Sequence, residues 1–335
     1  SSYRELLLKD SKLITDHYSK NQSPSFIKNR HDQSIFSILG KKHNSYILDN
    51  ETEFRNRKEL QYDYPILTVR ASNHGVKDKL KLLTIGSAVG ASNSIVMIEK
   101  DKVIVFGGKQ IEEEYSPSNK VFLIDFSNSF SPIIKELKSM NFARSDGNAT
   151  IMPDGNIFLN GGHSYTDLEF SVFTPEIYNP NAQTTKEMSN SYFRRNYHAS
   201  SLLLPDGRIL TAGGDVWNAE IFYPPYLFAK DNNDKTVLAK RPQIVNLDKD
   251  IKRGEKVEIE VNGEISKVSL ISTGSTTHAQ GSESKFRNIN FTKVSNDKIE
   301  IKLDNNSNNL QNGTYLLFVL NSKGTPSEGK IVFVN

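Results

Sequence analysis

An adjacent tyrosine and histidine, Tyr197 and His198, stand just ahead of an apolar run, a turn and a double glycine. An imidazole nitrogen is a common metal ligand, and a phenol oxygen can join it or act as a base. Neighbouring residues on an ideal strand point to opposite faces, so the pair can share one metal only at a strand end or a bulge. The alternative is a packed tyrosine beside a hydrogen-bonded histidine. Spacing alone leaves both interpretations open.

Three further side chains could line the mouth of a ligand site, because each follows a double glycine. His163 and Tyr165 follow the second one, and Trp217, the only tryptophan, follows the third on an expected loop. A loop tryptophan can stack on a sugar, whereas packing between two domains is the alternative use of such a ring. The remaining histidines lie in polar sequence without ligand spacing and are expected to be solvated: His17, His31, His43 and His74.

The composition excludes several classes of function. The 335 residues are enough for one large domain or two. With 42 basic and 39 acidic residues and no long basic run, nucleic acid is not an expected partner. No stretch approaches the roughly 20 apolar residues that span a bilayer. The chain has no cysteine, which excludes disulfides, thiolate metal sites and a cysteine nucleophile within it.

One phrase occurs three times along the chain. "KDKVIVFGG", "PDGNIFLNGG" and "PDGRILTAGG" end at Gly108, Gly162 and Gly214, at intervals of 54 and 52 residues. Each combines a turn, a strand and two glycines, and a second strand with an aromatic residue follows. This pattern predicts four short strands per repeat, as in kelch-type β-propeller blades, with a generic antiparallel sandwich as the alternative. We expect blades over 35–235, three clear and part of a fourth, after an irregular arm at 1–34.

The pattern changes at Arg241. Short strands such as "KVEIEV", "KVSLIS" and "KIVFVN" are joined by Gly, Asn and Ser turns, which favours an immunoglobulin-like β-sandwich over 236–335. The charged, Asn-rich segment "AKDNNDKTVLAKRP" suits a domain boundary. The predicted fold class is all-β, with an incomplete ring of propeller blades followed by the sandwich. Outside residues 3–17, no helix longer than about two turns is expected.

Several motifs resemble the copper radical oxidases, the glyoxal oxidase and galactose oxidase family. They are "MNFARSDGNATIMPDGNIFLNGG", "RNYHASSLLLPDGRIL", "AEIFYPPYLF" and "VSLISTGSTTHAQG", and the resemblance runs from about residue 60 to 335. It implies a seven-bladed kelch propeller whose C-terminal domain sends a histidine along the axis to copper. By position, Tyr197 would be the axial tyrosine and base, and His198 and His278 the two imidazole ligands. Such a donor set suits tetragonal Cu(II).

The resemblance also implies oxidation of a primary alcohol or aldehyde by O2 with release of H2O2. That reaction needs a second redox centre, a tyrosyl radical joined to a cysteine, which cannot form within a chain that has no cysteine. Three or four blades would also leave open sheet edges. We therefore expect the isolated chain to be inactive, and a partner chain to supply the missing blades and the Cys-Tyr pair.

Two other hypotheses remain. In the first, the chain descends from such an oxidase, has lost catalysis and serves as a structural or binding subunit of a larger assembly. Alternatively, it is a kelch module that binds proteins or glycans and carries no metal. The resemblance alone favours a secreted protein.

Overall fold

The computed structural model describes only part of the chain. Those residues are 92–109, 116–127, 132–164, 170–273, 285–307 and 309–335, together with the backbone of 275–277 and 280–282. All of them belong to one compact unit, Leu83–Asn335. The predicted arm at 1–34, the start of the propeller region, Tyr165 and His278 lie outside the described residues.

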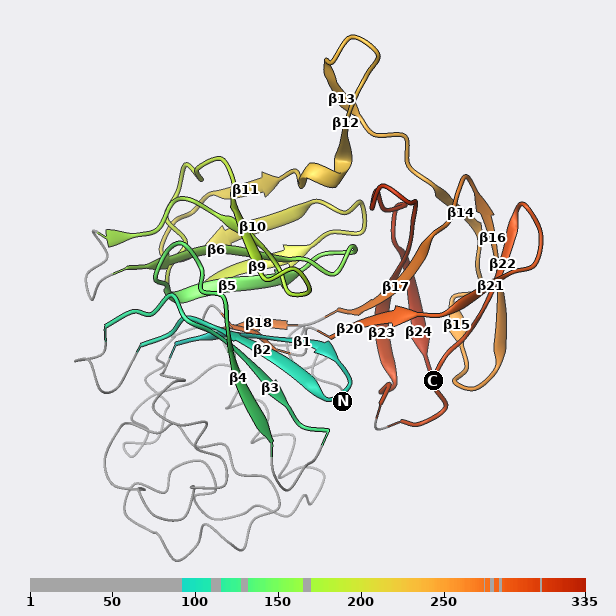
Figure 1. Cartoon of the computed structure of the whole chain (residues 1–335), viewed down its shortest axis with the longest axis horizontal. Coiled ribbons are helices and arrows are strands. Elements are labelled where there is room, and N and C mark those ends of the chain that lie inside the picture. Colours follow the sequence, from blue (N-terminus) through green and yellow to red (C-terminus); the bar gives the residue numbers. More distant parts are fainter. Residues whose placement is uncertain are drawn as a thin grey trace, which may run out of the picture. The chain divides into compact units, whose positions relative to one another are not determined.

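Three antiparallel sheets succeed one another along the first part of the described chain (Figure 1). The first contains β1 (Ser94–Glu99), β2 (Lys102–Phe106), β3 (Val121–Asp125) and β4 (Ile133–Leu137). The second contains β5 (Ser145–Ile151), β6 (Ile157–His163), β7 (Glu176–Asn179) and β8 (Thr184–Glu187). The third contains β9 (Ala199–Leu203), β10 (Ile209–Gly213) and β11 (Ala219–Phe222). Each predicted turn, strand and double glycine falls on the second strand of a sheet, namely β2, β6 or β10, and we refer to the sheets as blades.

The blades pack through their first strands, because β5 contacts β1 of one neighbour and β9 of the other. Apolar residues fill the space between the first two blades, where the rings of Phe106 and Tyr178 meet edge to face with centroids 5.3 Å apart. Polar bonds also cross from blade to blade: Ser94 Oγ donates to the Gly147 carbonyl at 2.6 Å. The resulting stack is continuous from the first blade to the third.

The segment between the blades and the second domain is more ordered than a linker. A 3-10 turn, Pro225–Leu227, leads into a hairpin of β12 (Phe228–Lys230) and β13 (Thr236–Leu238). The hairpin therefore takes up much of the stretch predicted as a plain boundary. In the part of the chain that the structure describes, no helix is long and apolar enough to cross a membrane.

The second domain is a β-sandwich, as predicted. One sheet has the order β14 (Gln243–Asn246), β16 (Lys256–Asn262), β22 (Lys298–Lys302) and β21 (Phe291–Lys293). The other has the order β15 (Asp250–Ile251), β24 (Lys330–Val334), β23 (Gly313–Leu320), β17 (Lys267–Ser272) and β20 (Phe286–Ile289). Inward-facing residues of the two sheets, such as Ile259 and Leu317, form one buried core. The alternating "KVEIEV" and "KIEIKL" runs supply one side of that core.

Candidate functional site

Tyr197 and His198 lie in the turn that enters β9, directly before that strand begins at Ala199. His198 has a left-handed backbone with φ of 65°. The two rings stack with centroids 4.0 Å apart and an interplanar angle of 29°. Because the left-handed residue breaks the alternation of a strand, adjacent side chains project to the same side. The pair thus satisfies the condition for sharing one metal ion.

Two glycines at the end of β10 allow the backbone of this turn to approach closely without a steric clash. Gly213 lies opposite Ala199 in the sheet, and a Cβ atom on it would stand 2.8 Å from the His198 carbonyl oxygen. A Cβ atom on Gly214 would stand 2.9 Å from the Asn196 nitrogen. Both glycines have positive φ, so a side chain would be strained as well as obstructed. The double glycine is therefore part of the site's construction.

A buried cation, Arg195, holds the chain two residues before Tyr197. Arg195 is 1% exposed, and its guanidinium donates to the carbonyls of Asn218 at 2.9 Å and Gly213 at 3.3 Å. It also faces Glu220 Oε2 at 3.3 Å. Burial lowers the pKa of Arg195, and the Glu220 charge opposes that shift. These contacts attach the entrance of β9 to the ends of β10 and β11.

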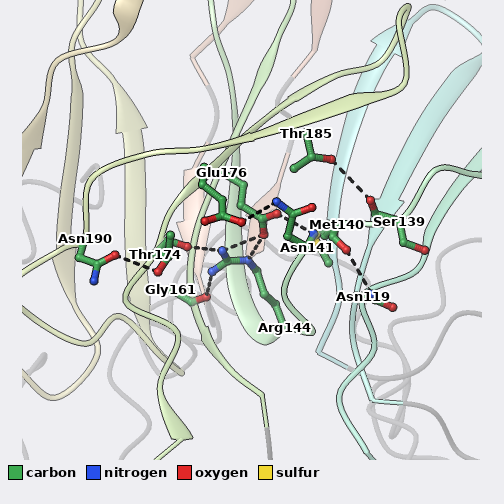
Figure 2. Close-up of polar contacts among 11 residues, drawn as sticks. Asn119, Ser139, Met140, Asn141, Arg144, Gly161, Thr174, Glu176, Thr185 and Asn190 are labelled. Atoms are coloured by element: carbon green, nitrogen blue, oxygen red, sulfur yellow. Dashed lines mark hydrogen bonds and ion pairs between the residues drawn. The ribbon is translucent and has the colours of Figure 1, made fainter.

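The preceding blade contains an equivalent buried arginine–glutamate pair with a shorter separation. Figure 2 shows Arg144, whose Nη2 lies 2.9 Å from Glu176 Oε2 and whose Nη1 donates to the Gly161 carbonyl at 2.7 Å. The Thr174 carbonyl accepts a further bond. Both charged side chains are buried, at 4% and 0% exposure. Because the arrangement recurs in two blades, the anchor is a feature of the repeat and not specific to the Tyr197 turn.

The left-handed residue also recurs. Asp146, with φ of 57°, precedes Gly147, which pairs with Gly161 as Ala199 pairs with Gly213. Asp146 is thus the counterpart of His198 one blade earlier. Ser92, with φ of 61°, stands ahead of β1, and its carbonyl accepts the Asp146 amide at 2.9 Å. Successive blades therefore begin with a left-handed residue, and the types differ: serine, aspartate, histidine.

Asp146 forms a buried polar cluster with His163. Its Oδ2 lies 2.9 Å from His163 Nε2, and Lys109 Nζ is 4.0 Å away. Ser145 Oγ is 3.1 Å from the same imidazole nitrogen. Burial works to raise the pKa of Asp146, but hydrogen bonds from His163 and Ser92 and the Lys109 charge lower it overall. This cluster keeps a carboxylate ionised near the strand entrance that corresponds to the Tyr197 turn.

The predicted mouth residues are placed differently from one another. His163 ends β6 and is 5% exposed, so it is a strand residue turned to Asp146, not an exposed loop residue as predicted. Trp217 does lie in the loop between β10 and β11, and its side chain is fully exposed. Sequence reasoning missed Tyr192, which is 89% exposed and whose amide donates to Glu220 Oε1 at 2.7 Å. A ligand role for His163, Tyr165 and Trp217 remains a prediction.

A hairpin of the second domain reaches the first strands of the blades. Its strands are β18 (Ser275–Thr277) and β19 (Gln280–Ser282), which pair with each other. Both contact β9, and β19 also contacts β1 and β5. His278, between these strands in the sequence, lies outside the described residues, so its distance to Tyr197 and His198 is not defined.

The donor types fit copper, because phenol oxygen and imidazole nitrogen are ligands that Cu(II) accepts. Within the described ranges, no group of three or more His, Cys, Asp or Glu side chains could hold a metal. A metal ion held by Tyr197 and His198 would therefore need at least one further ligand from elsewhere. The predicted third donor, His278, is carried by the hairpin segment that touches β9.

Comparison with known proteins points to a family. Residues 241–334 match the family model of the galactose oxidase-like Early set domain. A galactose oxidase of Gibberella zeae is 30% identical over 250 residues, covering 70% of this chain and 36% of that protein. These matches support the copper radical oxidase family for this chain. An aldehyde oxidase of Arabidopsis thaliana is 25% identical over 369 residues, covering 96% of this chain and 57% of its own length.

The fold of this chain is also found in a solved structure. A fungal alcohol oxidase in complex with copper has a TM-score of 0.67 at 23% identity, covering 73% of this chain and 54% of that chain. The present chain thus spans about a third to just over half of the length of these relatives. The predicted family resemblance and the all-β fold class are both confirmed.

Proposed function

We propose that Tyr197, His198 and His278 bind copper in a galactose oxidase-like or glyoxal oxidase-like protein. The reaction would be the oxidation of a primary alcohol or aldehyde by O2, in which a substrate RCH2OH and O2 give RCHO and H2O2. The observation that carries this proposal is the stacked Tyr197 and His198 pair at a left-handed strand entrance. The contact of β18 and β19 with β9 supports His278 as the third donor.

Copper, when bound, would supply one-electron redox chemistry and Lewis acidity. The chain's own contribution begins with the Tyr197 phenol, which is 45% exposed and can meet a substrate from solvent. Its oxygen would take the hydroxyl proton of the alcohol. Arg195 and the double glycine hold the turn before substrate arrives, which reduces the ordering needed on binding.

The second electron needs a centre that this chain does not contain. The family resemblance implies a cysteine-linked tyrosyl radical, and there is no cysteine among the 335 residues. We propose that kelch-type blades carrying this centre come from a partner chain or from a segment outside this sequence. The short coverage of the relatives, 36% and 57%, motivates the proposal.

A second candidate function is a non-catalytic propeller in a larger assembly. The lack of cysteine favours it, because the radical cofactor cannot form within the chain. Under this alternative, the exposed rings of Tyr192 and Trp217 would contact a partner protein or a glycan. This role would not require Tyr197 and His198 to bind a metal.

Elemental analysis after dialysis against Cu(II) separates the two candidates. Native material should contain about one copper per chain. The variants His198→Ala and His278→Ala should each lose it, whereas His43→Ala, a histidine predicted to be solvated, should retain it. Mass spectrometry of the same sample should find a partner with kelch blades and a cysteine, and only that complex should form peroxide from an alcohol. Copper-free protein without such a partner would contradict the oxidase proposal.

A further inference from the structure

A cavity of about 790 Å³ lies at the other ends of the blade strands, away from the Tyr197 turn. Its walls come from three blade turns, at 98–100 between β1 and β2, 154–155 between β5 and β6 and 180–181 between β7 and β8, and from one face of the sandwich domain. The volume is within the range of about 300 to 1,000 Å³ that is usual for small-molecule sites. Neither Tyr197 nor His198 lines it.

Direct contacts between blade and sandwich fix the shape of this cavity. Lys267 Nζ donates to the Asp154 carbonyl at 2.7 Å and lies 5.1 Å from the centre of the Phe286 ring. A Cβ atom on Gly155 would stand only 3.3 Å from that ring. Phe286 itself is buried in the core shared by the blades and the sandwich. The cavity is therefore built by packed elements and does not depend on a ligand to form.

Three cations in the cavity wall have no carboxylate within ion-pairing distance among the described residues: Lys267, Arg287 and Lys302. Arg287 donates to the carbonyls of Phe286 and Asn309, which are neutral. Burial lowers the pKa of both Lys267 and Arg287, as expected for cations taken partly out of water. A bound anion would compensate these charges.

The carboxylates of the same wall already have donors. Asp154 accepts from the Asn156 amide at 3.0 Å and from Asn156 Nδ2 at 2.6 Å, and its charge partly offsets the effect of burial on the pKa of Lys267. Glu99 Oε2 accepts from Lys102 at 2.8 Å. Asp304 accepts from the Asn306 amide at 2.9 Å and from Asn309 Nδ2 at 2.7 Å. These bonds, Asn306 first, lower the pKa of Asp304 and keep it ionised within its own loop. The cavity therefore offers cations, while its acidic groups are engaged elsewhere.

The remaining polar groups are amides. Asn288, Asn290 and Asn305 are exposed, line the cavity and carry no side-chain hydrogen bond in the described part of the chain. An amide both donates and accepts, which suits sugar hydroxyls. The aromatic side chain in the wall, Phe286, is 7% exposed and covered by Lys267, so it offers no face for a nucleotide base.

We propose that this cavity binds a short acidic saccharide, with its carboxylates at the cations and its hydroxyls at the amides. The inference is independent of copper and of the oxidase reaction, and it concerns a different end of the blades. Lys302 is the best residue to test, because it is exposed and has no partner among the described residues, so its replacement should leave the fold intact.

Calorimetric titration of the full chain tests the proposal with tetragalacturonate and a neutral galacto-oligosaccharide of equal length. Tetragalacturonate should bind, and the neutral sugar should bind about tenfold more weakly or worse. Lys302→Gln should weaken tetragalacturonate binding by about threefold to tenfold. Lys323→Gln, an exposed lysine in the turn between β23 and β24, should leave it unchanged. Higher salt should weaken binding further.

Equal affinity for the two sugars, or no effect of Lys302→Gln, would overturn the proposal. Tighter binding of ATP or inorganic phosphate than of tetragalacturonate, with the same dependence on Lys302, would also overturn it, because the ligand would then be a phosphate. Circular dichroism of both variants should match the parent spectrum, which confirms that any loss of binding reflects the cavity and not the fold.

Discussion

Replacing Arg144 or Arg195 by leucine compares two copies of one structural device. Each arginine is buried where the chain enters a blade, and each pairs with a glutamate on the third strand. The partners differ, because Glu176 is 0% exposed and Glu220 is 21% exposed. We predict that Arg144→Leu destabilises the protein more than Arg195→Leu, although Arg195 is the more buried cation, at 1% against 4% exposure.

The expected magnitudes follow from what each change leaves behind. Without Arg144, the buried Glu176 carboxylate retains only the Asn141 amide, which donates to its Oε1 at 2.7 Å. Removing one partner of a buried ion pair costs about 3–5 kcal/mol. Without Arg195, the Glu220 side chain is still partly exposed, and its Oε1 still accepts from the Tyr192 amide. The cost should be about 1–3 kcal/mol, the range for a lost charged hydrogen bond.

Urea unfolding followed by far-ultraviolet circular dichroism measures both variants, because the signal reports the sheets directly. A further variant, Arg144→Leu with Glu176→Leu, should recover much of the lost stability, since no charge is then left buried. Equal losses for the two single variants, or a larger loss for Arg195→Leu, would refute the claim that partner burial determines the cost. An unrecovered double variant would show that packing, and not charge, dominates.

Three other changes give distinct expectations. Gly161→Ala should lower the free energy of unfolding by more than about 2 kcal/mol, because its Cβ would stand 1.9 Å from the Arg195 carbonyl oxygen at φ of 66°. The control Gly324→Ala, with φ of 79° and open space around it, should cost only about 1 kcal/mol. Equal losses would contradict the close-approach argument. Asp146→Asn should lower the free energy of unfolding by about 1.5–3 kcal/mol above about pH 5 and by less below about pH 4. The pKa of Asp146 is lowered in the folded protein, so its carboxylate stabilises the fold above the pKa of the unfolded state, and this stabilisation is lost as pH falls through the folded-state pKa. A loss in urea midpoint that does not depend on pH would count against this argument. Tyr178→Phe should be neutral or stabilising by up to about 1 kcal/mol, because the Tyr178 hydroxyl is buried without a hydrogen bond in the described part of the chain. Burial also raises the pKa of Tyr178 to about 12. Clear destabilisation in a thermal melt would contradict this prediction, because the hydroxyl would then have a hydrogen-bond partner.

The sequence predicted the strands well because each carries a local signal. Alternating or apolar runs such as "VIVFGG" and "KVEIEV" end in turns with fixed chemistry, and the structure places β2 and β16 there. The double glycines lie where the neighbouring backbone approaches the end of a strand closely. Gly161, directly beneath the Arg195 carbonyl, shows why no other residue suits such a position.

The site was predicted less completely, because it depends on backbone conformation and on contacts between blades. Nothing in the sequence marks His198 as left-handed, yet that φ of 65° is what turns Tyr197 and His198 to the same side. The paired Arg144 and Glu176, and Arg195 and Glu220, could have been noticed, since both residues of each pair recur in the aligned repeats, "FARS" with "FRRN" and "PEIY" with "AEIF". The recurrence of an arginine before the first strand and a glutamate in the third strand of both repeats was the available signal.

Other features had no sequence signal at all. The Asp146 and His163 contact joins the neighbouring strands β5 and β6 of one blade at Asp146, whose backbone is left-handed with φ of 57°. The cavity beside Lys267 and Phe286 is formed by turns and strands far apart in the chain. The positions of these residues depend on how the blades pack against the sandwich domain. The local sequence pattern does not determine that packing.

Electron paramagnetic resonance of the Cu(II)-loaded full chain tests the central claim most directly. Binding by His198, His278 and the Tyr197 phenol predicts a tetragonal copper spectrum with hyperfine splitting from imidazole nitrogens. His198→Ala and His278→Ala should each reduce that nitrogen splitting. Tyr197→Phe should change the copper spectrum but retain the nitrogen splitting. A signal equal to that of aqueous copper, or one unchanged in both histidine variants, would contradict a copper site built on the Tyr197 turn.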